Sequence, residues 1–169
     1  MDYSYLIISG TNRLNSNTIR VAKQYQQLLA DKGNDSTLYS LEEWKWLEKT
    51  PESDAVQNQL FLPAQRFIFI LPEYNGSIPG VLKLMIDLSD HQLIWQKKKA
   101  LLTGISTGRA GNLRGMEHMT GILNYLNVVV HPNKLPISSI DKLLNGKGEI
   151  SDAATLKAID TQLNEFVEF

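Results

Sequence analysis

The residues best suited to chemistry lie near the N-terminus, in a polar stretch at positions 9–18 that reads SGTNRLNSNT. It offers the guanidinium of Arg13, and it contains four hydroxyl side chains, those of Ser9, Thr11, Ser16 and Thr18. Apolar residues at helical spacing follow, so the stretch should lead into a helix whose first N–H groups are free and partly positive. Such a helix start favours an anion, and charge-assisted hydrogen bonds would hold a phosphate there. Alternatively, Ser16 only caps the helix and Arg13 is a surface residue, and this stretch by itself does not decide between the two.

Two further polar stretches, residues 72–79 (PEYNGSIP) and 106–115 (STGRAGNLRG), have a similar character. Each directly follows an apolar run and is too interrupted by glycine or proline to continue it as a strand. In a doubly wound parallel sheet, the loops after the first, third and fourth strands open at one carboxyl edge, where such sheets bind ligands. We therefore expect the three stretches to form one binding site.

The elements that position these loops alternate between strand and helix. The unbroken apolar run at 67–71 is typical of an inner strand buried on both faces. Further strands are expected at residues 3–8, 35–41, 100–105 and 128–130. Helices are expected after the first loop up to Gly33, from Pro79, over residues 116–126 and from about Ser151. Residues 42–62 should be irregular before a short helix, and residues 133–150 should form an irregular connection. The pattern predicts an α/β fold, a flavodoxin-like, five-stranded doubly wound parallel sheet of order 2-1-3-4-5 with helices on both faces.

The composition and net charge of the chain exclude several classes of function. The chain has 169 residues, of which 43% are hydrophobic and 21% charged, and this fits a single domain over residues 1–169. A net charge of −1 without extended basic clusters argues against binding of nucleic acid or an anionic membrane. The absence of cysteine excludes thiol catalysis, disulfides and thiolate metal sites, so any redox chemistry must come from a cofactor. The first apolar run is too short for a signal peptide or a membrane span, and a cytoplasmic location is expected.

Several familiar sites are not indicated. The first loop has neither GxGxxG nor GxxxxGK[ST], which disfavours a dinucleotide fingerprint and a P-loop. It also lacks the acidic residues of a response-regulator receiver. Surface or packing roles are favoured for the three histidines, His91, His118 and His131, and no metal-ligand spacing is present.

Two of the stretches resemble the signatures of a known family. Residues 10–18, through Gly10, Thr11, Arg13, Ser16 and Thr18, resemble the G-S-x-R-x-x-S-x-N/T loop of the NADPH-dependent FMN reductase family, which includes quinone, azo-dye and chromate reductases. Residues 72–83 (PEYNGSIPGVLK) resemble that family's P-E-Y-N-x-S-x-P-G-x-L-K signature, and they follow the third expected strand as the family requires. The next helix departs from the family pattern, because it reads LKLMIDL where L-K-N-A-I-D-W is usual.

The resemblance implies an NAD(P)H-dependent FMN oxidoreductase that passes a hydride from NADPH or NADH, by way of flavin N5, to quinones, azo compounds, metal oxyanions or free flavin. No catalytic side chain is then required, because the cofactor supplies the chemistry. The phosphate would lie in the first loop, and the second and third loops would border the ring. The implied cofactor-binding residues are Ser9, Thr11, Arg13, Ser16, Asn17, Thr18, Pro72, Glu73, Tyr74, Asn75, Gly76, Ser77, Ser106, Thr107 and Gly108. A flavodoxin-type electron carrier is the alternative, although such carriers tend to be strongly acidic.

A homodimer or homotetramer is also expected. Residues 84–95 (LMIDLSDHQLIW) contain more apolar side chains than one buried helix face needs, and such patches commonly mark an interface. The resemblance implies the same, with the flavin near the subunit boundary. Arg109 in the third loop would either meet a nucleotide phosphate or be solvated, and the second interpretation is slightly favoured.

Overall fold

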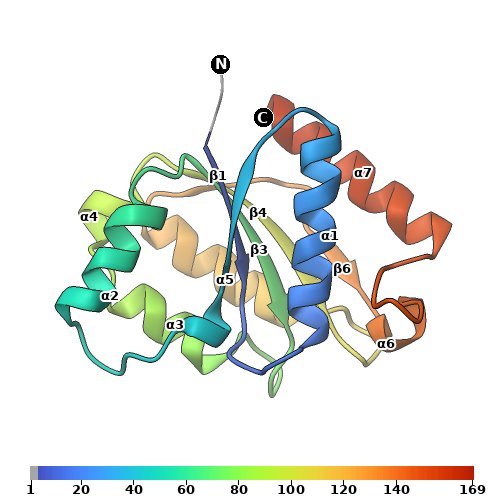
Figure 1. Ribbon diagram of the computed structural model, residues 1–169, viewed down its shortest axis with the longest axis horizontal. Coiled ribbons are helices and arrows are strands. Elements are labelled where there is room, and N and C mark those ends of the chain that lie inside the picture. Colours follow the sequence, from blue (N-terminus) through green and yellow to red (C-terminus); the bar gives the residue numbers. More distant parts are fainter. Residues whose placement is uncertain (1–3) are drawn as a thin grey trace.

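The computed structural model describes residues 4–169, and a parallel sheet with helices on both faces lies at its centre (Figure 1). The strands are β1 Tyr5–Ser9, β2 Ser36–Ser40, β3 Arg66–Pro72, β4 Lys99–Ile105, β5 Val129–Val130 and β6 Leu135–Ile137. Their order is β2-β1-β3-β4-β5, and β6 also pairs with β4. Every pairing is parallel. The predicted order is confirmed, while position 3, where the first strand is expected to begin, lies outside the described residues.

Strand β3 is the inner strand that the apolar run predicts. Successive side chains of a strand point to opposite faces. Accordingly, Phe67, Phe69 and Leu71 pack in the core on one face, and Ile68 and Ile70 pack in the core on the other. A strand covered on both sides requires such an unbroken run.

The helices divide between the two faces. Their bounds are α1 Asn17–Asp31, α2 Pro51–Val56, α3 Gly80–Asp87, α4 His91–Ile94, α5 Leu113–Tyr125, α6 Ile140–Leu143 and α7 Ala153–Glu168, with η1 at Leu41–Glu43 and η2 at Gln57–Phe61. Helices α1 and α7 pack on one face, and α3 and α5 pack on the other (Figure 1). Pro79 is the N-cap of α3 instead of its first helical residue, a shift of one position. Among residues 4–169, no helix combines the length and apolar character needed to cross a bilayer.

The far edge of the sheet differs from the prediction. The strand expected at 128–130 is reduced to β5, and the chain leaves the sheet before returning as β6 beside the second half of β4. His131 turns inward in the intervening segment and packs edge-on against Phe166 and Phe169. The irregular connection predicted for residues 133–150 is therefore wrong at β6 and α6. A three-residue strand that contains Pro136 gives almost no β signal in the sequence.

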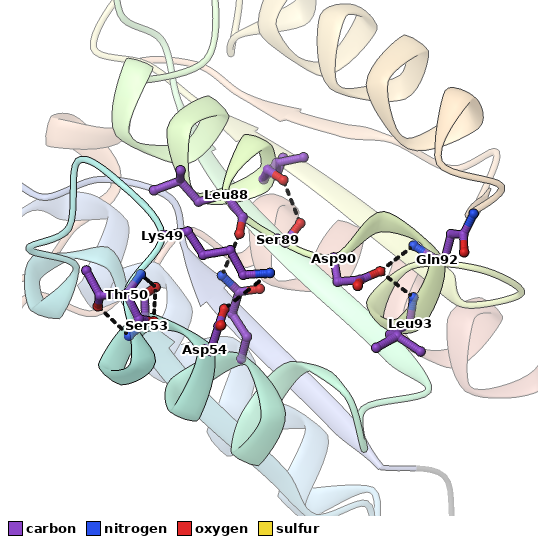
Figure 2. Close-up of polar contacts among 11 residues, drawn as sticks. Lys49, Thr50, Ser53, Asp54, Leu88, Ser89, Asp90, Gln92 and Leu93 are labelled. Atoms are coloured by element: carbon purple, nitrogen blue, oxygen red, sulfur yellow. Dashed lines mark hydrogen bonds and ion pairs between the residues drawn. The ribbon is translucent and has the colours of Figure 1, made fainter.

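The connection between β2 and β3 is irregular and then helical, as predicted. Thr50 and Ser53 form a capping box at the start of α2, in which each side chain accepts a hydrogen bond from the other residue's amide (Figure 2). Lys49 lies 3.6 Å from the Asp54 carboxylate beside it. The connection is thus ordered by caps and local pairs, which hold it against the helices of the same face.

The apolar surplus expected at residues 84–95 is mostly absorbed by the chain's own core. Asp90 caps α4, and its carboxylate accepts hydrogen bonds from the amides of Gln92 and Leu93 at 3.0 Å each, which keep its pKa below the usual value (Figure 2). The following Ile94 and Trp95 turn inward and are buried. Leu93, at 61% exposure, is the large apolar side chain of this segment that stays outside.

Candidate functional site

A cavity of about 500 Å³ lies where the three predicted loops meet, beyond the carboxyl ends of β1, β3 and β4. Its lining contains predicted residues from each loop: Arg13, Ser16, Asn17 and Thr18 from the first, Pro72, Glu73, Tyr74 and Asn75 from the second, and Ser106 and Thr107 from the third. Leu14, Asn15, Ile105 and Ile140 complete the wall. A volume of this size is typical of a small-molecule site.

The first loop presents a helix start to the cavity. The Ser16 hydroxyl caps α1 by accepting a hydrogen bond from the amide of Ile19 at 3.3 Å. The amides of Asn17 and Thr18 have no hydrogen-bond acceptor within residues 4–169. No acidic side chain occurs in the first turn of α1. Both interpretations of Ser16 therefore hold in part: it is an N-cap, and the amides next to it remain free for an anion.

Arg13 is not simply a solvated surface residue. Its guanidinium carbon lies 4.0 Å from the centre of the Tyr74 ring, within the range of a cation–π contact. The Tyr74 hydroxyl is 2.7 Å from Oγ1 of Thr11, and the same Oγ1 accepts a hydrogen bond from the Arg13 amide at 3.3 Å. Thr11 thus joins the first loop to the second from a buried position behind the cavity.

The second loop is a tight two-residue hairpin. Tyr74 and Ser77 exchange both of their backbone hydrogen bonds, at 3.0 and 3.1 Å. Asn75 and Gly76 occupy the turn with φ of 53° and 74°, a conformation that Asn-Gly adopts readily. Tyr74 and Asn75 therefore stand at the cavity in a fixed orientation.

The third loop is held from behind by the segment that follows β6. The Ser106 hydroxyl donates to the carbonyl of Gly108 at 3.1 Å and accepts from the amide of Gly111 at 3.0 Å. The carbonyl of Gly108 also accepts from the amide of Ser139 at 3.0 Å. The Ser106 side chain is thus used within the loop, and Thr107 is the hydroxyl of this loop that remains available at the cavity.

Some predicted site residues do not reach the cavity wall: Ser9, Thr11, Gly76, Ser77 and Gly108. Ser9 is fully buried at the end of β1, and its hydroxyl has no hydrogen-bond partner in the described part of the chain. Ser77 points instead to α5, where its hydroxyl lies 2.8 Å from Nδ1 of His118. Sequence reasoning gave His118 only a surface or packing role, because its contact with Ser77 depends on the tertiary fold.

Asn112 is a second supporting residue that the sequence did not indicate. It has a φ of 63° at the N-cap of α5, and its side chain donates to the carbonyl of Leu71 at 2.9 Å, immediately before the second loop. Its Oδ1 accepts from the amide of Gly115. Asn112 therefore fixes the start of α5 against the end of β3.

The remaining polar candidates contribute little to the cavity. Arg109 is exposed outside the lining, in accord with the solvated interpretation. His131 is buried at 4% exposure in a packing role, and burial lowers the pKa of its imidazole. Within residues 4–169, no group of three His, Asp or Glu side chains could hold a metal ion.

The cavity combines two kinds of surface. The free amides of Asn17 and Thr18 and the cationic Arg13 belong to the lining, a donor set that suits a dianionic phosphate. The apolar Ile105 and Ile140 also belong to the lining, and apolar side chains suit a planar ring. The residues present therefore fit a flavin mononucleotide.

Comparison with known proteins gives independent findings. Residues 4–142 match the family described as NADPH-dependent FMN reductase. The chain is 28% identical over 120 residues to a 2-hydroxy-1,4-benzoquinone reductase from Burkholderia sp, an alignment that covers 69% of this chain and 66% of that protein. It is 34% identical over 105 residues to an NAD(P)H-dependent FMN reductase of Pseudomonas aeruginosa, covering 59% and 56%. It is 33% identical over 112 residues to a quinone reductase of Escherichia coli, covering 63% and 58%. The aligned part thus spans less than two thirds of each of these relatives.

Solved structures agree on the fold. The flavoenzyme NAD(P)H:(acceptor) oxidoreductase FerB from Paracoccus denitrificans superposes with a TM-score of 0.78 at 19% identity, covering 99% of this chain and 96% of that one. An NADH:FMN oxidoreductase superposes with a TM-score of 0.70 at 16% identity, covering 97% and 88%. At these identities the likeness concerns the fold alone, and that fold is flavodoxin-like.

Proposed function

We propose, from the premise that this chain belongs to the NADPH-dependent FMN reductase family, that it is an NAD(P)H-dependent FMN oxidoreductase acting on quinones or similar electron acceptors. Family membership brings FMN as the cofactor and NAD(P)H as the co-substrate. The proposed acceptors include azo compounds, metal oxyanions and free flavin besides quinones. We further propose that residues 1–169 work as one domain, and the cytoplasmic location expected from the sequence stays a prediction.

One observation carries the proposal: free helix amides, a cationic side chain and apolar walls meet in a single cavity at the sheet's carboxyl edge. The amides of Asn17 and Thr18 and the guanidinium of Arg13 would hold the phosphate. Ile105 and Ile140 would cover the ring and exclude water from it. When bound, FMN supplies hydride transfer at its N5, so that NAD(P)H and a proton reduce a quinone to the hydroquinone.

The side chains of the cavity accordingly act by binding and orientation. Tyr74 is fixed from both sides, by Thr11 through its hydroxyl and by Ser77 through the backbone, and it would set the position of the ring edge. We propose no catalytic side chain, because the bound cofactor would supply the chemistry.

Steady-state oxidation of NADH and NADPH with a quinone tests the proposal, together with the visible spectrum of the purified protein. We expect a bound flavin spectrum, one FMN per chain, and quinone-dependent turnover. Tighter binding of FAD than of FMN would contradict the cofactor assignment. Flavin binding without nicotinamide-dependent turnover would instead favour an electron carrier.

We also propose a homodimer or homotetramer, assembled through the helical face formed by α3, α4 and α5. The proposal is supported by a groove of about 610 Å³ between these helices and by the exposed side chains of Leu93 and Tyr125, at 61% and 85% exposure. Light scattering on the wild type and on a Leu93→Glu, Tyr125→Glu double variant tests it. We expect the variant to be monomeric and to keep its fold, because both chosen positions are exposed. A monomeric wild type would remove the proposal.

A further inference from the structure

The hairpin at the second loop behaves as one rigid piece. Its four residues, Tyr74 to Ser77, are closed by two backbone hydrogen bonds, and both central residues have positive φ. A displacement of Ser77 must therefore move Tyr74 and Asn75, which line the cavity. Whatever holds Ser77 also sets the shape of the cavity wall.

Helix α5 contacts this hairpin with two side chains. Nδ1 of His118 lies 2.8 Å from the Ser77 hydroxyl. A guanidinium nitrogen of Arg114 lies near Gly76, at 3.7 Å from the place where a Cβ would stand. Residues four apart share one face of a helix, so Arg114 and His118 lie on the same face of α5, beside the hairpin.

The helix itself is a firm support. Met116, Met119 and Leu123 anchor α5 in the core, and each is almost fully buried. At its start, the Asn112 side chain binds the carbonyl of Leu71, the residue before the second loop begins at Pro72. His118 thus connects the hairpin to a part of the fold that has little freedom to move.

The opposite end of the hairpin is connected to the first loop. The Tyr74 hydroxyl pairs with Thr11, and Arg13 lies over the Tyr74 ring. Contacts therefore run from His118 through Ser77 and Tyr74 to the proposed phosphate cradle. The hairpin is thus supported at Tyr74 by Thr11 and at Ser77 by His118. Of these two supports, only Thr11 belongs to the three loops that the sequence indicated.

We propose that His118 is a positioning residue of the flavin site, which holds the hairpin through Ser77 so that Tyr74 and Asn75 border the isoalloxazine ring. The inference rests on the proposed function, because it concerns the same cavity. It assigns a role to a residue that does not itself reach the cavity wall. The Ser77 hydroxyl and Nδ1 can each donate or accept, and the tautomer of the ring decides which of them donates.

The test compares flavin binding by the chain of 169 residues and its variants, measured by the quenching of flavin fluorescence. His118→Ala is expected to raise the Kd of FMN by about 3- to 10-fold, the effect of losing one ordinary hydrogen bond. Riboflavin should lose the same factor, because the hairpin borders the ring and not the phosphate. His118 is exposed in the single chain but also lines the groove between α3, α4 and α5, so light scattering first checks that the variant has the mass of the wild type. At equal mass, the thermal unfolding midpoint without flavin should stay unchanged.

Two conservative variants at position 118 distinguish an effect of the hydrogen bond at Nδ1 from an effect of side-chain size. In His118→Asn the amide stands where Nδ1 stands, so it should restore the wild-type Kd within about 2-fold. In His118→Gln the amide reaches the position of Nε2 and should behave like alanine. Equal restoration by both, or by neither, overturns the proposal.

A double-variant cycle tests the pairing with Ser77. Ser77→Ala, His118→Ala and the combined variant should all show about the same loss, because each removes one shared hydrogen bond. Independent losses that multiply in the combined variant overturn the inference. A wild type that binds no FMN overturns the proposed function first, whereas a wild type that binds FMN with an affinity unaffected by His118→Ala overturns only the role of His118.

Discussion

Removal of the Arg13 guanidinium should weaken FMN and spare riboflavin. A hydrogen bond to a charged group contributes about 1.5–3 kcal/mol. The Arg13 guanidinium lies 4.0 Å from the centre of the Tyr74 ring, and it would leave this ring to bind the phosphate. The loss of an exposed cation–π contact costs about 0.5–1 kcal/mol, which is subtracted from the contribution of the new hydrogen bond. The net loss in Arg13→Ala is therefore about 0.5–2.5 kcal/mol, or roughly a 2- to 70-fold higher Kd for FMN.

The assay is equilibrium titration of the chain of 169 residues with FMN and with riboflavin, which lacks the phosphate. Riboflavin should bind the wild type and Arg13→Ala with the same affinity. Arg20→Ala is a matched control, because Arg20 is an exposed arginine on α1 that lines a different groove. An equal loss for both ligands in Arg13→Ala would refute the reasoning, since it would mean that Arg13 supports the loop structure instead of the phosphate.

Two further predictions concern stability. Gly111 has a φ of 56°, and an added Cβ would lie 2.7 Å from the backbone of Ile137, so Gly111→Ala should lower the free energy of unfolding by about 2–4 kcal/mol in urea titrations. Gly108→Ala is its control, because nothing lies within 4 Å of a Cβ there, and similar losses in both variants would contradict the steric argument. For His131, the pKa in the folded chain is lowered by burial, so the unfolded chain binds more protons below the usual value of 6.5. The free energy of unfolding should therefore fall as the pH drops below about 6.5, and this slope should be reduced in His131→Phe; an unchanged slope would show that other groups cause it.

The sequence predicted those strands and loops whose residues show a clear hydrophobic or turn pattern of their own. The apolar run of β3 and the broken sequence after it specify an inner strand and a loop wherever they occur, and the cavity forms where three such loops meet. Strand β6 was missed because its pairing comes from β4 and not from its own three residues, one of which is a proline. The contact between Ser77 and His118 was missed for a related reason. These residues are 41 positions apart, and neither helical nor strand periodicity encodes which polar side chains meet across elements.

The apolar segment after α3 shows what composition leaves open, and the interface predicted there stays a prediction. The segment is rich in apolar residues, but composition alone does not distinguish a side chain buried in the core of its own chain from one buried against a partner chain. Ile94 and Trp95 are buried at the end of α4, a separate short helix that Asp90 caps after α3 has ended at Asp87. The predicted interface therefore depends on fewer residues than the sequence suggested.

The split between β5 and β6 affects how the sheet ends. A long, regular edge strand presents a row of unpaired amides and carbonyls to which a second chain can add by further pairing, a route to aggregation. Here the edge consists of two short pieces separated by the inward turn at His131. The carbonyl of Ile137 bonds back to Ser106, so the neighbouring Pro136 faces outward and has no N–H to offer an incoming strand. This edge is therefore protected against strand-by-strand growth without any covering helix.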